Sequence, residues 1–271
     1  MITFHKILAG CEAGEREAWE EFLKEYTPIA YRLAAIYVPS SSEARSQLWS
    51  ESLQALAAHG FERLRRFDHQ AEREFLADLR NFLFEQATAK VDRAGDSSGA
   101  PPPTPESVGV LLRGLPLLHQ EILFLKLAGY SDATLEKMLR LTPTIAAQGL
   151  ARLQADYTPV LNRERDQGTW AAAWLELLAQ ARASHTADCA PLRQFVRIQD
   201  GQTSWYDKDP LERHMAGCLC CLDRWTTLRE LVYWRHELKP ARGEEIEALL
   251  AGLPVSAEAR KKSLFKRMFG S

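Results

Sequence analysis

Leu211-Glu-Arg-His-Met-Ala-Gly-Cys-Leu-Cys-Cys-Leu-Asp-Arg-Trp225 is a stretch that holds three of the chain's five cysteines and one histidine within eight residues. In a continuous helix, His214, Cys218 and Cys221 occupy positions i, i+4 and i+7, so their side chains share one face. Cys220 falls on roughly the opposite side. Thiolates and imidazoles are ligands that zinc prefers. The stretch therefore predicts three ligands of a metal site on one helix.

The fourth ligand is expected from outside this stretch. Cys189 lies upstream and is predicted to supply it from a second helix, which gives the pattern C-x24-H-x3-C-x2-C. The predicted Zn²⁺ ligands form a closed set: Cys189, His214, Cys218 and Cys221. His185 is a rival to Cys189, although its spacing fits less well. Two other interpretations stay open: a redox sensor in which the bound thiolates and Cys220 are oxidised, and buried cysteines in an ordinary helix pair.

The composition is that of an ordinary globular protein. Of 271 residues, 46% are hydrophobic and 26% are charged, with a formal net charge of −2. No apolar run approaches the ~20 residues of a membrane span, and the first residues lack the apolar core of a signal peptide. Clustered cysteines without an export signal favour a reducing compartment, so we expect the cytoplasm. An enzyme is not expected, because phosphate-loop, nucleophile-elbow and His-Glu-x-x-His motifs are missing and a closed zinc site leaves no open position.

Helical periodicity runs through almost the whole chain and predicts an all-α fold. We expect one break near Pro28, where a new helix would begin at Ile29. The small, proline-rich stretch 95–105 is predicted to be a linker. The predicted segments are 1–94, the linker 95–105, 106–160, 161–240, and 241–271, which comprises a C-terminal helix and a basic tail.

Two short helices are expected inside the segment 106–160. They span Asp132–Arg140 and Thr144–Asp156, and the turn Leu141-Thr-Pro143 separates them. Two short helices joined by a tight turn have the layout of a helix-turn-helix, whose second helix reads the major groove of DNA.

The order of these segments resembles a bacterial extracytoplasmic-function sigma factor. The stretch from Ala9 to Ala35 is similar to the family's opening helices, and Gln47-Leu-Trp-Ser-Glu-Ser-Leu53 stands where the family has its clamp-binding pattern. Leu115-Pro-Leu-Leu-His-Gln-Glu-Ile-Leu-Phe-Leu-Lys126 is similar to the opening of the family's second domain. The resemblance implies that the first domain binds the RNA polymerase clamp and the promoter −10 element, and that the second reads the −35 element.

The resemblance also implies which residues make these contacts. The expected polymerase-binding residues are Gln47, Leu48, Glu51 and Leu53. The expected DNA-binding residues are Lys90 and Arg93 in the first domain and Thr144, Gln148 and Arg152 in the second.

The chain departs from the family where DNA is bound. In the second reading helix the family's Lys and Arg align with Ala147 and Gly149, and residues 106–160 hold five Lys/Arg against five Asp/Glu. Because phosphate contacts by Lys and Arg supply most of the non-specific affinity, promoter binding is expected to be weakened. The alternative is a sigma-derived adaptor that works through protein contacts alone.

The third segment is similar to a zinc-binding anti-sigma domain over about residues 185–240, through its ligand spacing and the Leu-Glu-Arg before His214. In that family a helical bundle docks between the two sigma domains and occludes their polymerase-binding surfaces. The family often continues into a transmembrane helix, and this sequence shows no such apolar run. We therefore expect a transcription regulator held in check in cis, with release by zinc loss, thiol oxidation or a signalling protein partner.

Overall fold

Helices are the only regular secondary structure in the part of the chain that the computed structural model describes. These residues contain twelve helices and no strand, which confirms the all-α prediction. They fall into two compact units. None of their helices combines the length and the apolar character that crossing a membrane requires. The described residues are 3–38, 41–66, 69, 71–91, 112, 115–161 and 167–255.

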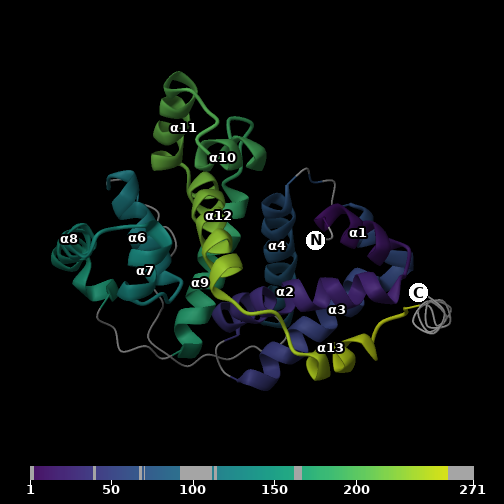
Figure 1. The fold of residues 1–271 in the computed structure, drawn as a ribbon. Coiled ribbons are helices and arrows are strands. Elements are labelled where there is room, and N and C mark those ends of the chain that lie inside the picture. The colour runs from purple at the N-terminus through teal and green to yellow at the C-terminus, as the bar shows by residue number, and fades with distance from the viewer. Residues whose placement is uncertain are drawn as a thin grey trace. The chain divides into compact units, whose positions relative to one another are not determined.

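The first unit comprises the described residues of Met1–Ala35, Ser41–Gln86 and Glu237–Ser271. Its core is a cluster of four aromatic rings: Trp19, Phe22, Tyr26 and Phe75. The centroids of neighbouring rings in this cluster are 5.0 to 6.0 Å apart. All four side chains are fully buried. Its helices are α1 (Phe4–Glu12), α2 (Arg16–Tyr37), α3 (Ser42–Arg65), α4 (Glu72–Val91) and α13 (Gly243–Leu250) (Figure 1).

The predicted break at Pro28 is wrong, because α2 continues through this proline. A proline inside a helix cannot donate a hydrogen bond to the carbonyl four residues earlier, which here belongs to Lys24. That carbonyl instead accepts a hydrogen bond of 3.0 Å from the backbone N–H of Ala241, just before α13. The cost of the proline is therefore partly offset by a bond to the far end of the chain. The break occurs earlier, at Gly14, whose φ of +71° separates α1 from α2.

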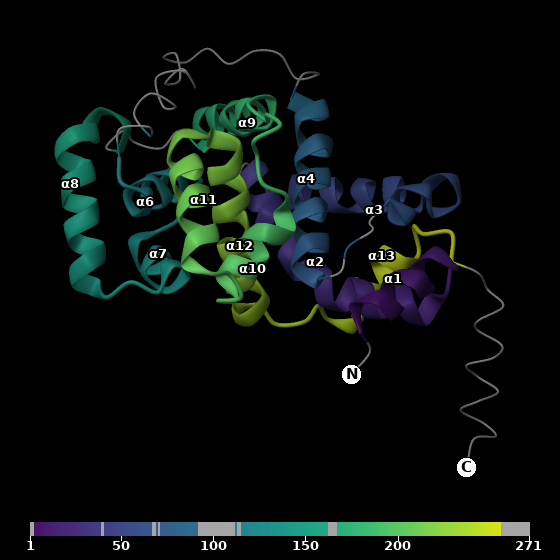
Figure 2. The same cartoon turned by 90° about the horizontal axis from the view of Figure 1, so that it is seen from above.

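The second unit comprises the described residues of Ile36–Ser40 and Ala87–His236. The predicted pair of short helices is present as α7 and α8, and both pack against α6 (Figure 2). Ser131 caps the start of α7, and Arg140 ends it in the left-handed conformation with a φ of 54°. The helices are α6 (Leu117–Leu127), α7 (Asp132–Leu139), α8 (Pro143–Leu161), α9 (Gln167–Ala183), α10 (Leu192–Gln199), α11 (Trp205–Gly217) and α12 (Leu219–Glu237).

Gly149 has a packing role inside α8. A β-carbon at this position would lie 2.9 Å from Cδ1 of Ile122 and 3.4 Å from Cδ2 of His119, both on α6. The first distance is too short for two carbon atoms, so a larger residue here would force the Ile122 side chain to shift, and glycine permits this approach of α8 to α6 without it. Glycine in a helix costs about 1 kcal/mol relative to alanine. The close packing of α8 on α6 therefore comes with this cost.

The division into units differs from the division into sequence segments. Residues of the 106–160 and 161–240 segments share the second unit, whereas α13, from the last segment, belongs to the first unit. The 95–105 linker and the basic tail lie outside the described residues.

Candidate metal centre

The four predicted metal ligands lie together. One ligand atom from each of Cys189, His214, Cys218 and Cys221 is within 4.8 Å of all the others. The Sγ atoms of Cys189 and Cys218 are 3.6 Å apart, close to the roughly 3.8 Å that separates two thiolates on a tetrahedral zinc with bonds of about 2.3 Å. The cluster can therefore hold a metal ion, as the sequence predicted.

The expected single helix is wrong, because α11 ends at Gly217 and α12 begins at Leu219. Glycine weakens a helix interior, and Cys218 adopts an extended conformation with φ −120° and ψ 110°. Its carbonyl accepts a hydrogen bond from the backbone N–H of Leu222, so it caps the new helix. The ligands therefore meet at a joint between two helices, with His214 on one side and Cys221 on the other.

Cys189 also lies outside any helix, contrary to expectation. It ends a turn between α9 and α10, in which its N–H donates to the carbonyl of Thr186 at 3.1 Å. The N–H of Thr186 in turn donates to Sγ of Cys189 at 3.3 Å. A guanidinium nitrogen of Arg224 on α12 donates to the carbonyl of Ala190 at 2.7 Å. These bonds fix the thiol at the joint, whereas the rival His185 is exposed and is not among the four clustered residues.

The electrostatics of the cluster favour a cation. Burial raises the pKa of Cys189, but hydrogen bonds from Thr186 and the nearby side chains of His214 and Cys218 outweigh it and lower the pKa from 9.0 to about 6. Burial raises the pKa of Cys221, and the neighbouring Cys218 and Cys189 raise it further. Three close thiols cannot all ionise without a compensating positive charge, which a bound metal ion supplies.

An orphaned atom supports the same assignment. Nε2 of His214 is buried and has no hydrogen-bond partner among the described residues. Leaving a buried polar atom unpaired typically costs about 1–3 kcal/mol, and a metal bond would remove that cost. The residues present therefore fit a metal ion of the type that thiolates and imidazole bind.

The other two cysteines take no part. Cys220 is buried on the other side of α12 and is not in the cluster, as its spacing predicted. Burial raises its pKa to about 11. Cys11 is buried in the first unit, and this burial raises the pKa of its thiol as well. Neither thiol is ionised at neutral pH, so neither is a reactive nucleophile there.

The structure describes four of the five predicted DNA-binding residues. Thr144, Gln148 and Arg152 are exposed and stand one turn apart on α8, which places them on one face. Lys90 lies in the last turn of α4, and Arg93 lies outside the described residues. The contact with DNA itself stays a prediction.

Among the predicted polymerase-binding residues, the polar ones and the leucines differ in exposure. Gln47 is exposed and its side-chain amide donates to Glu51 at 2.8 Å. Leu48 and Leu53 are fully buried in the core of the first unit. In this conformation only Gln47 and Glu51 can offer side-chain surface to a partner.

Sequence reasoning missed a buried contact in the second unit. The Tyr130 hydroxyl donates to the carboxylate of Glu230 and accepts a hydrogen bond of 3.1 Å from the indole N–H of Trp234. Glu230 is 3% exposed. The sequence signal was the Glu230–Trp234 spacing, which puts both side chains on one face of a helix, but nothing in it identifies Tyr130 as their partner.

Comparisons with protein-family models, with curated proteins and with solved structures find no match for this chain. The centre is therefore interpreted from its own geometry.

Proposed function

We propose that the protein is a sigma-factor-like transcription regulator that acts with RNA polymerase and is controlled in cis by its zinc-binding, anti-sigma-like segment. The proposal rests on where the two helices after the metal cluster pack. The helix that starts at the cluster, α12, packs on the helices of the segment expected to read the −35 element. The next helix, α13, packs on the segment expected to bind the polymerase clamp.

The contact of α12 is made by polar side chains, several of them buried. Tyr130, in the turn between α6 and α7, is hydrogen-bonded to both Glu230 and Trp234. Directly before Glu230, the guanidinium of Arg229 lies 2.8 Å from the carboxylate of Glu121 on α6; Glu121 is 3% exposed. An ion pair with one buried carboxylate, together with the buried hydrogen bonds of Tyr130, favours one orientation of α12, because misalignment leaves these polar groups unpaired.

The contact of α13 uses a backbone bond, two apolar side chains and a surface ion pair. Ala241 donates to the carbonyl of Lys24, which Pro28 has left without its helical donor. Ile246 and Leu250 are 9% and 2% exposed. One nitrogen of Arg16, Nη2, reaches both carboxylate oxygens of Glu247, at 2.7 and 2.6 Å.

The end of α13 also approaches α3, the helix of the expected clamp-binding residues. A β-carbon at Gly252 would lie 3.6 Å from Nε2 of Gln54, one turn beyond Ser50 on α3. A large partner such as a polymerase clamp would compete with α13 for this neighbourhood. Because α13 is tethered to the first unit, its effective concentration is of order mM, so even weak docking keeps it beside α3.

Zinc is the proposed metal, because a closed Cys3His set is the usual structural zinc site. The ion would cross-link the joint between α11 and α12 to the turn that carries Cys189 and would supply the positive charge that the thiols need. The chain's own residues position α12: the metal ligands at its start, and Arg229, Glu230 and Trp234 along its length.

The test is transcription by core RNA polymerase with the full chain and with variants that release the inhibitory contacts. Leu250→Asp should displace α13 by burying a charge, and deletion of residues 238–271 should remove α13 while leaving α12 in place. We expect more transcript with each variant than with the wild type. The exposed neighbour variant Ala248→Asp is the control and should behave like the wild type. Unchanged transcription after the deletion would show that self-inhibition is wrong.

A second function is favoured by the surface of α8. In Pro143–Leu161 the only Lys or Arg is Arg152, beside exposed Ile145, Ala147 and Gln148. This face suits a protein partner, as expected of an adaptor that has lost promoter binding. A DNA-binding titration at low salt separates the two functions: binding that weakens as salt rises supports the regulator, and no binding supports the adaptor.

A further inference from the structure

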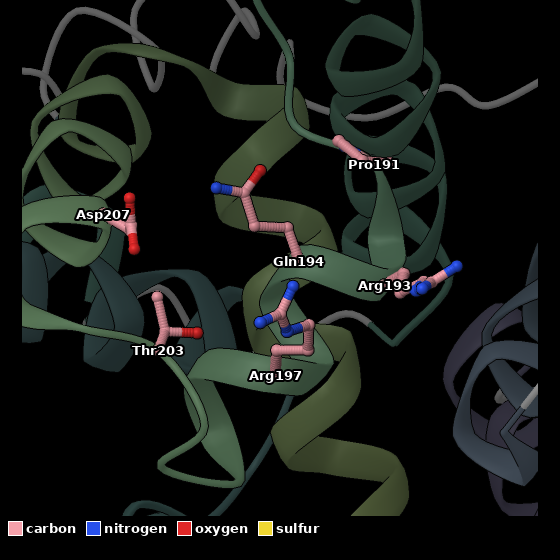
Figure 3. A pocket seen from close by; sticks show the side chains of 6 residues that line it. All are labelled: Pro191, Arg193, Gln194, Arg197, Thr203 and Asp207. Atoms are coloured by element: carbon pink, nitrogen blue, oxygen red, sulfur yellow. The ribbon is translucent and has the colours of Figure 1, made fainter.

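A cavity of about 550 Å³ lies in the second unit between α10 and the start of α11. This size is within the range of sites for small molecules. Neither the metal ligands nor the proposed DNA and polymerase contacts line it. Its lining residues are Pro191, Arg193, Gln194, Arg197, Thr203 and Asp207 (Figure 3).

Three hydrogen-bond donors of the cavity have no partner in the part of the chain that the structure describes. Oγ1 of Thr203 is buried and unpaired. The side-chain amide of Gln194 and the guanidinium of Arg197 likewise make no hydrogen bond or ion pair within the described residues. Figure 3 shows Gln194 and Arg197 facing the side of the cavity where Thr203 lies. A guanidinium, an amide and a hydroxyl around one space are the groups that bind an oxyanion.

The fourth polar group, Asp207, limits which anion fits. Its carboxylate accepts a hydrogen bond of 2.6 Å from the hydroxyl of Ser204, and its N–H donates to the same oxygen, which caps the start of α11. Its negative charge stands across the cavity from Arg197 (Figure 3). This charge repels a dianion such as phosphate, but its remaining acceptor capacity suits a ligand with a donor group.

We propose that this cavity binds a small carboxylic acid that carries a hydroxyl or amino group beside its carboxylate. Arg197 binds the carboxylate with a charge-assisted hydrogen bond, and the Thr203 hydroxyl and the Gln194 amide donate to the same group. Asp207 accepts a hydrogen bond from the ligand's hydroxyl or amino group. The volume left over accommodates the rest of the molecule. This site is independent of the proposed transcriptional function.

The cavity also adjoins the metal centre along the chain. Pro191 follows Cys189 by two residues, and Asp207 lies on α11, which carries His214. The two sites therefore draw on the same two segments of the chain, so the titration uses the metal-loaded protein.

Arg193 provides a matched control on the same helix. It stands one turn before Arg197, is exposed and makes no ion pair within the described ranges, yet Figure 3 shows its guanidinium pointing away from Thr203 and Asp207. Substitution of either arginine removes the same charge from the same surface. Arg197 faces Thr203 and Asp207 whereas Arg193 lines the cavity with its guanidinium turned away, so the pair separates a specific site from general attraction of anions.

The experiment is calorimetric titration of the metal-loaded full chain with lactate and with glycine, and with acetate and inorganic phosphate for comparison. We expect saturable binding of lactate or glycine that is tighter than that of acetate or phosphate. Arg197→Met should weaken it about tenfold or more, as loss of a hydrogen bond to a charged group implies, and Arg193→Met should weaken it much less, because that guanidinium points away from Thr203 and Asp207. Asp207→Asn should reduce the preference over acetate.

The proposal is overturned if neither lactate nor glycine binds saturably, if phosphate binds as tightly as they do, or if both arginine variants weaken binding equally. Thermal unfolding of each variant shows whether it is folded. Thr203→Val keeps the side-chain shape and removes the hydroxyl. This variant must also bind lactate or glycine more weakly, and an unchanged affinity would contradict the site.

Discussion

The two helices after the metal cluster are held in contrasting ways. Trp234 of α12 is 7% exposed and shares a buried hydrogen-bonded contact with Tyr130 and Glu230. α13 has eight residues, and its ion-paired residue, Glu247, has a side chain that is 64% exposed. Exposed ion pairs contribute about 0–1 kcal/mol, whereas burying a large apolar side chain contributes about 1.5–3 kcal/mol.

This difference separates a structural contact from a releasable one. The contact of α12 belongs to the core of its unit, so breaking it means opening that core. The contact of α13 rests on two apolar side chains, one backbone hydrogen bond and a surface ion pair, so it can open while the rest of the first unit stays folded. If the protein is a switch, α13 is the element that moves.

The largest effect is expected from the metal centre, since α12 begins there. Cys221→Ala should abolish stoichiometric metal binding and cost several kcal/mol of stability, because a structural metal contributes its binding free energy to folding. Mass spectrometry of the native protein gives the stoichiometry, and thermal unfolding with and without a chelator gives the stability. Cys220→Ala is the control and should keep the metal. Full metal occupancy in the Cys221 variant would refute the ligand set.

Removal of the indole from α12 should have the next largest effect. Trp234→Ala is expected to destabilise the second unit by about 3 kcal/mol, from the lost burial and the lost bond to Tyr130. Urea unfolding measures the change. Its neighbour Tyr233 is only half-buried, so Tyr233→Ala should cost less; equal costs would mean that α12 is not anchored through Trp234.

A core-facing residue of α13 should show the weaker contact directly. Leu250→Ala is expected to cost about 2 kcal/mol locally, and to raise hydrogen exchange in α13 and around Lys24 while leaving α12 unchanged. Leu249 is less buried, so Leu249→Ala should have a smaller effect. Exchange that rises in α12 as well would contradict separate release of the two helices.

The buried carboxyl of Glu121 should make the α12 contact depend on pH. Burial raises its pKa above 4.5, with Arg229 opposing the shift. Between the unfolded and folded pKa values the folded state binds more protons, so stability falls as pH rises through this window. Relative to Glu121→Gln, the wild type should lose up to about 1.4 kcal/mol per pH unit there. Urea unfolding at several pH values from 4.5 upward tests the sign, and a rising difference would contradict it.

The smallest effect concerns the carbonyl that Pro28 frees. Pro28→Ala supplies an N–H that can bond to Lys24 inside α2, in competition with Ala241. We expect faster hydrogen exchange at Ala241 and a loss of about 1 kcal/mol from the α13 contact. Pro210 also lies inside a helix, so Pro210→Ala is the matched control and should leave Ala241 protected. Unchanged exchange in the Pro28 variant would show that this bond does not help to hold α13.

Local sequence patterns predicted the metal site well. The types and spacing of His214, Cys218 and Cys221 sufficed to name three ligands, and the outlying Cys189 completed the set that the structure brings together. The metal preference of a side chain depends on its own chemistry, so it can be predicted from the sequence without knowledge of the fold. The path of the backbone could not be predicted in this way: one continuous helix was expected where the chain bends at Cys218.

The sequence by itself determined the all-α class, which Cys and His residues could form a metal site, and the helices α7 and α8, because helical periodicity and metal preference are local properties. Only the tertiary structure decided that the chain bends at Cys218, that Gly149 allows α8 to approach α6, that Leu48 and Leu53 are buried, and that Ala241 completes the bond Pro28 cannot make. Each of these depends on a partner distant in sequence or on a choice between backbone conformations of similar energy, which packing settles.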